Sequence, residues 1–139
     1  MLGPIEHPQP ITMTTAKSQT GTIGEQVAAN FLKQKGYEIL DMNFQNDSGR
    51  RLGEIDIIAR DNEINELVFV EVKTRDYQKY GKTLPEENIT RQKMRRLARI
   101  AEDYLRKNKF LDSNYRFDAI SVWIDEKEKR ARIKHIRSL

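Results

Sequence analysis

Two runs rich in β-branched residues, 54–60 and 67–75, give the clearest hydrophobic pattern in the chain. The polar segment between them has the composition of a turn. Because side chains alternate faces along a strand, the two runs predict a hairpin that is wholly apolar on one side. A loop at 62–65 would place Ile57 opposite Val70 and Ile55 opposite Val72, all on the apolar side. A slip of one residue would mix the apolar and polar faces, so the pattern predicts the parity of this register.

The polar face of this hairpin carries the main candidate chemistry. The same register places Asp56 opposite Glu71, and Glu54 opposite Lys73. Directly opposed residues have Cβ atoms about 4.5–5.5 Å apart, a distance at which like charges destabilise a strand pair. Two carboxylates that close need a cation or a shared proton. Carboxylate oxygens without a neighbouring histidine or cysteine suit Mg²⁺ or Mn²⁺, and Lys73 could orient or deprotonate an attacking water. The pattern therefore indicates metal-assisted phosphodiester hydrolysis.

A solvated strand face is the alternative interpretation of these two short motifs. Glu-x-Asp and Glu-x-Lys are frequent on exposed strands, so neither spacing is specific by itself. The context favours a site, because the run that precedes Glu71 is apolar on both faces, as in a central strand. Charged residues at the end of a buried strand are unfavourable unless they have a function.

The rest of the hydrophobic pattern predicts one α/β domain, in which a mixed central sheet is flanked by helices. Residues 1–19 contain three prolines and no periodicity, and we interpret them as a flexible leader before a single domain at 20–139. In the second helix, Thr83 and Glu86 have the spacing of a capping box. The predicted order is α-β-β-β-α-β-β: a helix from Thr22 that ends at Gly36, a strand over 37–44, the hairpin, a helix over 85–107, and strands over 115–124 and 131–136.

The second predicted helix is notably cationic. Lys93 lies four residues from both Ile89 and Leu97, so it falls on the apolar stripe. A half-buried lysine needs an anionic partner, and the acidic face of the hairpin is a candidate. Other basic residues of this helix and of the loops could contact phosphates, although a solvated helix face is the alternative. The candidate nucleic-acid-binding residues are Arg50, Arg51, Arg75, Lys93, Arg95, Arg96 and Arg99.

Two further acids have two interpretations each. Glu25 lies at the border of the apolar stripe of the first helix, where it could reach the metal site. It is equally well placed to close a capping box with Thr22. Asp118 lies inside an apolar strand, where pairing with a nearby arginine is the first interpretation and catalysis the second. The aromatic residues of that strand are predicted to belong to the core rather than to stack on bases: Tyr115, Phe117 and Trp123.

Composition narrows the classes of protein. The 139 residues include 25 lysines and arginines against 21 aspartates and glutamates, which gives a formal net charge of +4. The chain contains no cysteine and only two histidines, which excludes disulfides, thiolate zinc sites and histidine-rich metal sites. No apolar run approaches the roughly 20 residues of a membrane span, and the N-terminus lacks the apolar core of a signal peptide. We therefore expect a cytoplasmic protein without a membrane partner.

In combination, these residues resemble the YraN family of small bacterial proteins over about residues 20–136. That family is similar to the PD-(D/E)xK nucleases, which have a restriction-endonuclease-like fold and include archaeal Holliday junction resolvases. The Pro-Asp dipeptide that gives the superfamily its name is absent here, because Ile55 precedes Asp56. The resemblance is carried, in order, by Gly24-Glu25, Gly53-Glu54-Ile55-Asp56-Ile57-Ile58-Ala59, Val68-Phe69-Val70-Glu71-Val72-Lys73-Thr74-Arg75, Lys93 and Arg116-Phe117-Asp118.

The resemblance implies both a fold and a set of roles. It implies a helix, a three-stranded meander, a crossover helix and a further strand. It implies that Asp56 and Glu71 bind a divalent ion, that Lys73 serves the attacking water and that Glu25 assists. The cofactor would be Mg²⁺ or Mn²⁺.

The leading expectation is thus a Mg²⁺-dependent nuclease that hydrolyses DNA phosphodiester bonds, with branched or damaged DNA as candidate substrates. The first alternative is a non-catalytic nucleic-acid-binding protein with a degenerate nuclease-like site. The second is an accessory protein whose charged surface binds a protein partner. A homodimer is compatible with each of these functions.

Overall fold

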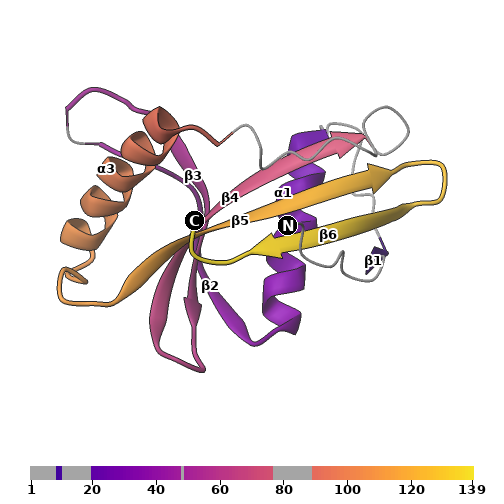
Figure 1. Ribbon diagram of the computed structural model, residues 1–139. Helices are drawn as coiled ribbons and strands as arrows, with labels where there is room; N and C mark the ends of the chain where they lie inside the picture. Colours follow the sequence, from indigo (N-terminus) through magenta and orange to yellow (C-terminus); the bar gives the residue numbers. More distant parts are fainter. Residues whose placement is uncertain (1–8, 11–19, 48, 77–88) are drawn as a thin grey trace.

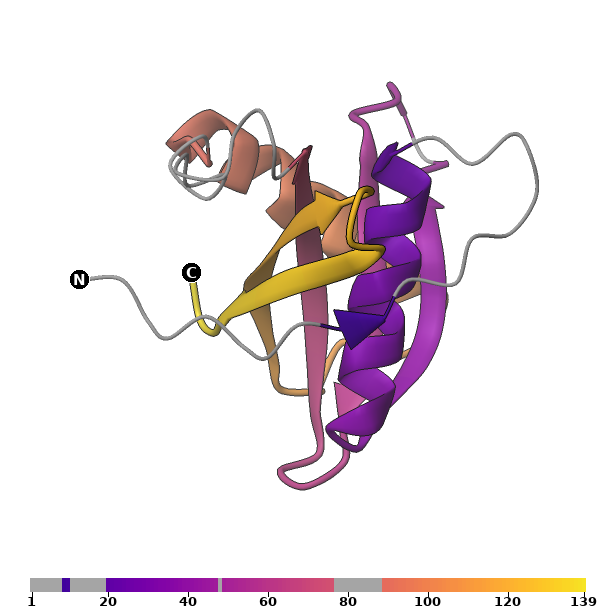
Figure 2. The ribbon, with the colours of Figure 1, turned by 90° about the vertical axis from the view of Figure 1, so that its right-hand side faces the viewer.

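A mixed β-sheet with one helix on each face forms the described part of the chain (Figures 1 and 2). The structure is a computed structural model, and it describes residues 9–10, 20–47, 49–76 and 89–139. The elements are, in chain order, β1 (Gln9–Pro10), α1 (Thr20–Gln34), β2 (Tyr37–Gln45), β3 (Glu54–Asp61), β4 (Glu66–Asp76), α3 (Arg91–Lys107), β5 (Tyr115–Asp125) and β6 (Arg130–Ile136).

The sheet has the strand order β1-β6-β5-β4-β3-β2. β4 and β5 are parallel, and every other neighbouring pair is antiparallel. A parallel pair needs a crossover connection, and α3 lies within the connection from β4 to β5. The predicted α/β class and the order α-β-β-β-α-β-β are therefore confirmed. β1 is additional: it lies in the segment predicted as a leader, and its Gln9 pairs with Ala131 of β6.

The central hairpin has the predicted loop, and its register is as predicted where the strands pair. The predicted pairings of Asp56 with Glu71 and of Glu54 with Lys73 are wrong, because they lie beyond the paired part. β3 and β4 pair as far as Ile57 with Val70, and residues 62–65 connect them. Asn65 closes the loop in the left-handed region, at φ 54°, which asparagine tolerates better than most residues. Both strands are buried over most of their length because helices cover both faces of the sheet.

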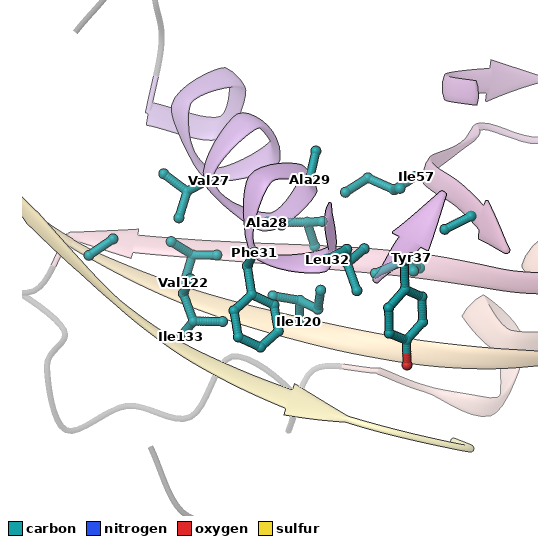
Figure 3. Close-up of a cluster of buried hydrophobic side chains, with 14 of the residues drawn as sticks. Val27, Ala28, Ala29, Phe31, Leu32, Tyr37, Ile57, Ile120, Val122 and Ile133 are labelled. Carbon is teal, nitrogen blue, oxygen red and sulfur yellow. The ribbon is translucent and has the colours of Figure 1, made fainter. Parts of the chain in front are cut away.

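Each face of the sheet has its own hydrophobic core. On one face, α1 packs its apolar stripe on alternate residues of the strands. Figure 3 shows Phe31 and Leu32 of α1 against Ile120 and Val122 of β5. On the other face, α3 covers a second cluster. The strand residues of that second cluster include Phe44, Ile55, Ile58, Leu67 and Phe69.

The first helix starts earlier than predicted. α1 begins at Thr20, so Thr22 is an interior residue and no acidic residue lies in the first turn. The capping-box interpretation of Glu25 is therefore wrong, because its partner is not at the helix start. The predicted end is correct: α1 finishes at Gln34, and Gly36 follows with φ +92°, which favours glycine.

The second helix starts later than predicted. Thr90 is extended and acts as the N-cap of α3, since its hydroxyl accepts a 3.1 Å hydrogen bond from the Lys93 backbone N. A helix through residues 89 and 90 is therefore wrong. The capping box predicted at Thr83 lies outside the described residues. In the described part of the chain, neither helix is long and apolar enough to cross a membrane.

Asp118 is fully buried in an ion-pair network on β5. Its carboxylate accepts hydrogen bonds from Arg116 Nε at 3.0 Å and from the Ser138 backbone N at 3.0 Å, and lies 2.8 Å from His135 Nε2. The predicted arginine partner is confirmed. Trp123 is buried as predicted, but Tyr115 is 48% exposed, so its assignment to the core is wrong. Tyr115 is the first residue of β5, and the fully buried part of that strand begins only at Asp118.

Gly24→Ala is expected to destabilise the fold, because α1 approaches β4 closely at this residue. A Cβ atom on Gly24 would overlap Oγ1 of Thr74 and lie 2.8 Å from its Cγ2. We expect the free energy of unfolding to fall by about 1–3 kcal/mol, as is usual for overpacking, in urea unfolding. A second substitution, Thr74→Ala, should restore part of that stability. Equal stability of Gly24→Ala and the native chain would contradict this packing.

Candidate metal centre

Asp56 lies where the two strands of the central hairpin, β3 and β4, separate, and we call this place the fork. The pairing of β3 with β4 ends at Ile57 and Val70. The two neighbours of Asp56 pack on opposite faces of the sheet, Ile57 in the cluster of α1 and Ile55 in that of α3. The Asp56 carboxylate reaches across to β4, where Oδ2 accepts a 2.7 Å hydrogen bond from the Val72 backbone N. The prediction that Ile55 shares the face of Ile57 is wrong, because the strand turns where it leaves its partner.

Three carboxylates from two elements gather at this fork. One oxygen from each of Glu25, Glu54 and Asp56 lies within 4.8 Å of the others. Glu25 comes from α1, and the close packing of the preceding Gly24 on β4 brings the helix to this end of the strand. Asn43 of β2 joins two of the acids, since its Nδ2 donates to Oε1 of Glu25 at 2.9 Å and to Oε1 of Glu54 at 3.1 Å. The fork therefore concentrates negative charge.

Glu71 of β4 is the fourth acid, and two lysines contact it. Lys93 of α3 places Nζ 2.6 Å from Glu71 Oε1, and Lys73 of β4 places Nζ 3.6 Å from the same oxygen. The predicted anionic partner of Lys93 is thus confirmed. Asp56 and Glu71 are both buried, and both line one cavity between the sheet and α3. The structure brings together the four residues predicted as catalytic, with Glu71 held by cations beside the other three acids.

The ionisation of these groups follows from burial and from their neighbours. Burial raises the pKa of Asp56 to about 8, and the charge of Glu71 raises it too, against the opposing hydrogen bond from Val72. Burial lowers the pKa of Lys73, and the neighbouring Lys93 lowers it further. Burial is the largest influence on Lys93 and acts to lower its pKa, but its hydrogen bonds and the negative charges of Glu71 and Asp56 together outweigh burial, so the pKa is raised. Like charges therefore lie close together in two groups: the carboxylates around Asp56, and the ammonium groups of Lys73 and Lys93.

The donor set fits a hard divalent cation. The converging ligand atoms are carboxylate oxygens, which Mg²⁺ and Mn²⁺ prefer over nitrogen or sulfur. His135, the histidine among the described residues, is half-buried and belongs to the separate network of Asp118, not to this fork. A divalent cation would also offset the repulsion between Asp56 and its acidic neighbours.

Asp56 is expected to make the metal-free protein less stable as the pH rises from 3.8 to about 8. Its pKa is higher in the folded than in the unfolded chain, so across this range the folded state holds a proton that the unfolded state has lost. Stability is therefore greatest below this range and falls as the proton leaves. Asp56→Asn cannot ionise but keeps an oxygen for the hydrogen bond from Val72.

At pH 8 without metal, we expect Asp56→Asn to be more stable than the native chain by about 1–3 kcal/mol, the usual penalty of an incompletely satisfied buried polar group. Near pH 4 the two should converge. Thermal unfolding followed by circular dichroism across this pH range measures the difference. Glu63→Gln, which changes an exposed acid of the hairpin loop, is the matched control. The same pH dependence in Asp56→Asn and the native chain would contradict the expectation.

Most of the predicted nucleic-acid-binding residues lie along α3 and the loop beside it. The loop between β2 and β3 is tied to α3, because the Asp47 backbone N donates to Asp103 Oδ2 at 3.2 Å and Lys107 Nζ lies 2.8 Å from Asp47 Oδ2. Arg75 is half-buried and donates to the Thr74 carbonyl, and no contact among the described residues brings it to this surface. Five of the predicted residues are exposed arginines of the loop and helix: Arg50, Arg51, Arg95, Arg96 and Arg99.

Two residues of the fork, Glu54 and Asn43, are not among the predicted site residues. Glu54 could have been predicted as a site residue, since it lies two residues before Asp56 on the same strand. Asn43 is harder to predict. Asparagine tolerates its φ of 55°, but the local sequence does not show that its side chain contacts Glu25. That contact depends on how β2 and α1 pack on each other.

Comparison with known proteins places the chain in a family. A family profile described as uncharacterised protein family UPF0102 matches residues 24–122. A UPF0102 protein of Caldicellulosiruptor saccharolyticus is 43% identical over 122 residues, which are 88% of this chain and 97% of that protein. A UPF0102 protein of Acetivibrio thermocellus is 42% identical over 120 residues, 86% of this chain and 87% of that protein. One of Moorella thermoacetica is 39% identical over 125 residues, 90% of this chain and 98% of that protein. The chain therefore belongs to the uncharacterised protein family UPF0102, the YraN family.

Proposed function

We propose that this protein hydrolyses phosphodiester bonds of DNA in a reaction that depends on Mg²⁺ or Mn²⁺. The observation that carries the proposal is the convergence of Glu25, Glu54 and Asp56 within 4.8 Å, with Glu71 and Lys73 lining the same end of the sheet. Buried acids that crowd together without a function are unfavourable. Oxygen donors beside a lysine are the arrangement that metal-assisted hydrolysis of a phosphate ester requires.

Each residue of the fork has a proposed role. Asp56 and Glu71 are the proposed ligands, and Glu25 and Glu54 complete the oxygen set. Within the described residues both lysine contacts of Glu71 are to Oε1, so Oε2 can serve as the ligand atom. The bound ion would polarise a phosphoryl oxygen and acidify a water. Lys73 would hold the attacking water by a hydrogen bond and stabilise negative charge that grows on the phosphate.

Exposed arginines beside the fork support nucleic acid as the substrate. Arg95, Arg96 and Arg99 of α3 are exposed, and the loop with Arg50 and Arg51 is tied to the same helix. Such residues bind phosphates by releasing condensed counterions, so binding should weaken steeply as salt rises. Branched and damaged DNA are the proposed preferred substrates.

The test of this function is cleavage of linear, flapped and four-way DNA by the purified protein with Mg²⁺, with Mn²⁺ and with a chelator. We expect cleavage that requires the metal and that is lost in Lys73→Ala. No metal-dependent cleavage of any of these DNAs, or equal cleavage by Lys73→Ala, would contradict the proposal.

A second function, nucleic-acid binding without catalysis, is favoured by one contact. The 2.6 Å ion pair of Lys93 with Glu71 partly neutralises a proposed ligand, as expected for a degenerate site. This function predicts salt-dependent DNA affinity that is the same with and without Mg²⁺. A protein-binding accessory role instead predicts negligible DNA affinity even at low salt.

A further inference from the structure

A cavity of about 260 Å³ lies between the fork of the sheet and α3. Its sheet wall contains the acids Glu54, Asp56 and Glu71, and its helix wall contains Lys93 and Arg96. The roles proposed for the metal centre use the sheet wall. Those roles do not account for the positive charge of the helix wall or for its apolar surface.

Arg96 is the cation of the helix wall that is available to a ligand. Lys93 is held by Glu71, whereas Arg96 forms no ion pair with any residue that the structure describes. A guanidinium offers a planar pair of N–H donors that matches phosphate oxygens. Because Arg96 faces a wall of acids across the cavity, an anion beside it would lie next to the proposed metal ligands.

The rest of the cavity is apolar. Leu97 and Ile100 of α3 are 5% and 1% exposed, and the half-buried Leu52 adds a third apolar side chain from the neighbouring loop. An apolar surface beside one free guanidinium fits a ligand that combines a phosphate with a flat ring of low polarity on its faces. A nucleotide has this composition, and bases outside a helix stack on aromatic or apolar side chains.

We propose that this cavity receives one unstacked nucleotide of the substrate strand, with its base against Leu52 and Leu97 and its phosphate on Arg96. The cavity is smaller than the roughly 300–1,000 Å³ of typical ligand pockets, so it limits the occupant to no more than a single nucleotide. A base inside a stacked duplex enters such a pocket only after extrusion. The proposal rests on the proposed function and narrows its substrate class to single-stranded DNA or DNA with an unpaired nucleotide.

The test is the affinity of thymidine 5′-monophosphate, which contains no phosphodiester bond and so is not consumed. It is measured by calorimetry with Mg²⁺ present, for the native chain and three variants. Arg96→Ala removes the cavity cation, and Arg95→Ala removes an equal charge from the neighbouring exposed position outside the cavity. Leu52→Trp fills the cavity from its loop side without a change of charge, and its circular dichroism spectrum shows whether it is folded.

We expect Arg96→Ala and Leu52→Trp each to weaken nucleotide binding about tenfold or more, the effect of losing one hydrogen bond to a charged group or the space for the base. Arg95→Ala should change it by about twofold at most. Equal weakening by Arg95→Ala and Arg96→Ala would overturn the proposal, as would unchanged binding by folded Leu52→Trp. Nucleotide binding with the expected pattern but no DNA cleavage would refute the hydrolysis and leave the pocket in place. DNA cleavage without this pattern of nucleotide binding would support the hydrolysis and refute the pocket.

The same variants test the substrate class. We expect the native chain to bind a single-stranded oligonucleotide more tightly than a fully paired duplex of the same sequence at equal salt. Arg96→Ala should remove this preference, whereas Arg95→Ala should weaken both DNAs by a similar factor. A native preference for the duplex would contradict the proposal.

Discussion

Asp56→Asn is expected to lower the rate of metal-dependent DNA cleavage by about a thousandfold. Asp56 is the acid common to the whole fork: it lies with Glu25 and Glu54 in one group, and the charge of Glu71 acts on it. An amide in its place keeps the hydrogen bond from Val72 but removes the negative charge that a divalent ion needs. Loss of one electrostatic contribution at a reacting phosphate typically reduces the rate by about 10²–10³-fold, and loss of the ion removes more.

This prediction separates catalysis from folding. The same substitution is expected to stabilise the metal-free protein at pH 8, so a lost activity cannot result from unfolding. Single-turnover cleavage at saturating protein, with unfolding curves on the same samples, measures both effects. Glu63→Gln of the hairpin loop should cleave at the native rate. An Asp56→Asn variant that retains more than about a tenth of the native rate would contradict the assigned role.

Lys73→Met is expected to lower the cleavage rate about 10²–10⁴-fold while leaving metal affinity intact. Its Nζ lies 3.6 Å from Glu71 Oε1 and its side chain is only 20% exposed, so the ammonium is held beside the proposed ligands without being one of them. Methionine keeps the length and the apolar contacts of the side chain. The substitution therefore removes the positive charge and the hydrogen-bond donors with little change in packing.

The readouts of Lys73→Met are the cleavage rate at saturating DNA and the Mn²⁺ affinity, measured by electron paramagnetic resonance of free Mn²⁺. A structural role would weaken metal binding and the rate together, whereas a role at the reacting phosphate lowers the rate alone. Lys127→Met, in the exposed turn between β5 and β6, is the matched control. If Lys73→Met cleaves at the native rate, Lys73 does not serve the attacking water.

Much of the site is predictable because short-range patterns determine it. The register of β3 on β4 follows from side-chain alternation, since a one-residue slip would expose the apolar face. The partner of Lys93 is predictable for a similar reason: a lysine on the apolar stripe of a helix must meet an anion, and the hairpin offers Glu71. Both inferences need only the period of a strand or a helix.

The fork itself is not predictable from such patterns. β4 separates from β3 after Val70 and continues along β5 to Asp76. This path depends on contacts between segments that are far apart in the sequence. Where the strands part, Ile55 turns to the other core and Asp56 lies between the faces. The contribution of Asn43 and the cavity beneath α3 arise in the same way, from the packing of whole elements on each other.

The most direct test of the metal centre is a crystal of the native chain soaked with Mn²⁺, in which anomalous scattering locates the ion. We predict an anomalous peak in the fork, within bonding distance of Asp56 and of at least one oxygen of Glu25, Glu54 or Glu71. A soaked crystal whose fork holds no Mn²⁺, with these carboxylates still in the contacts that they make without metal, would contradict the account.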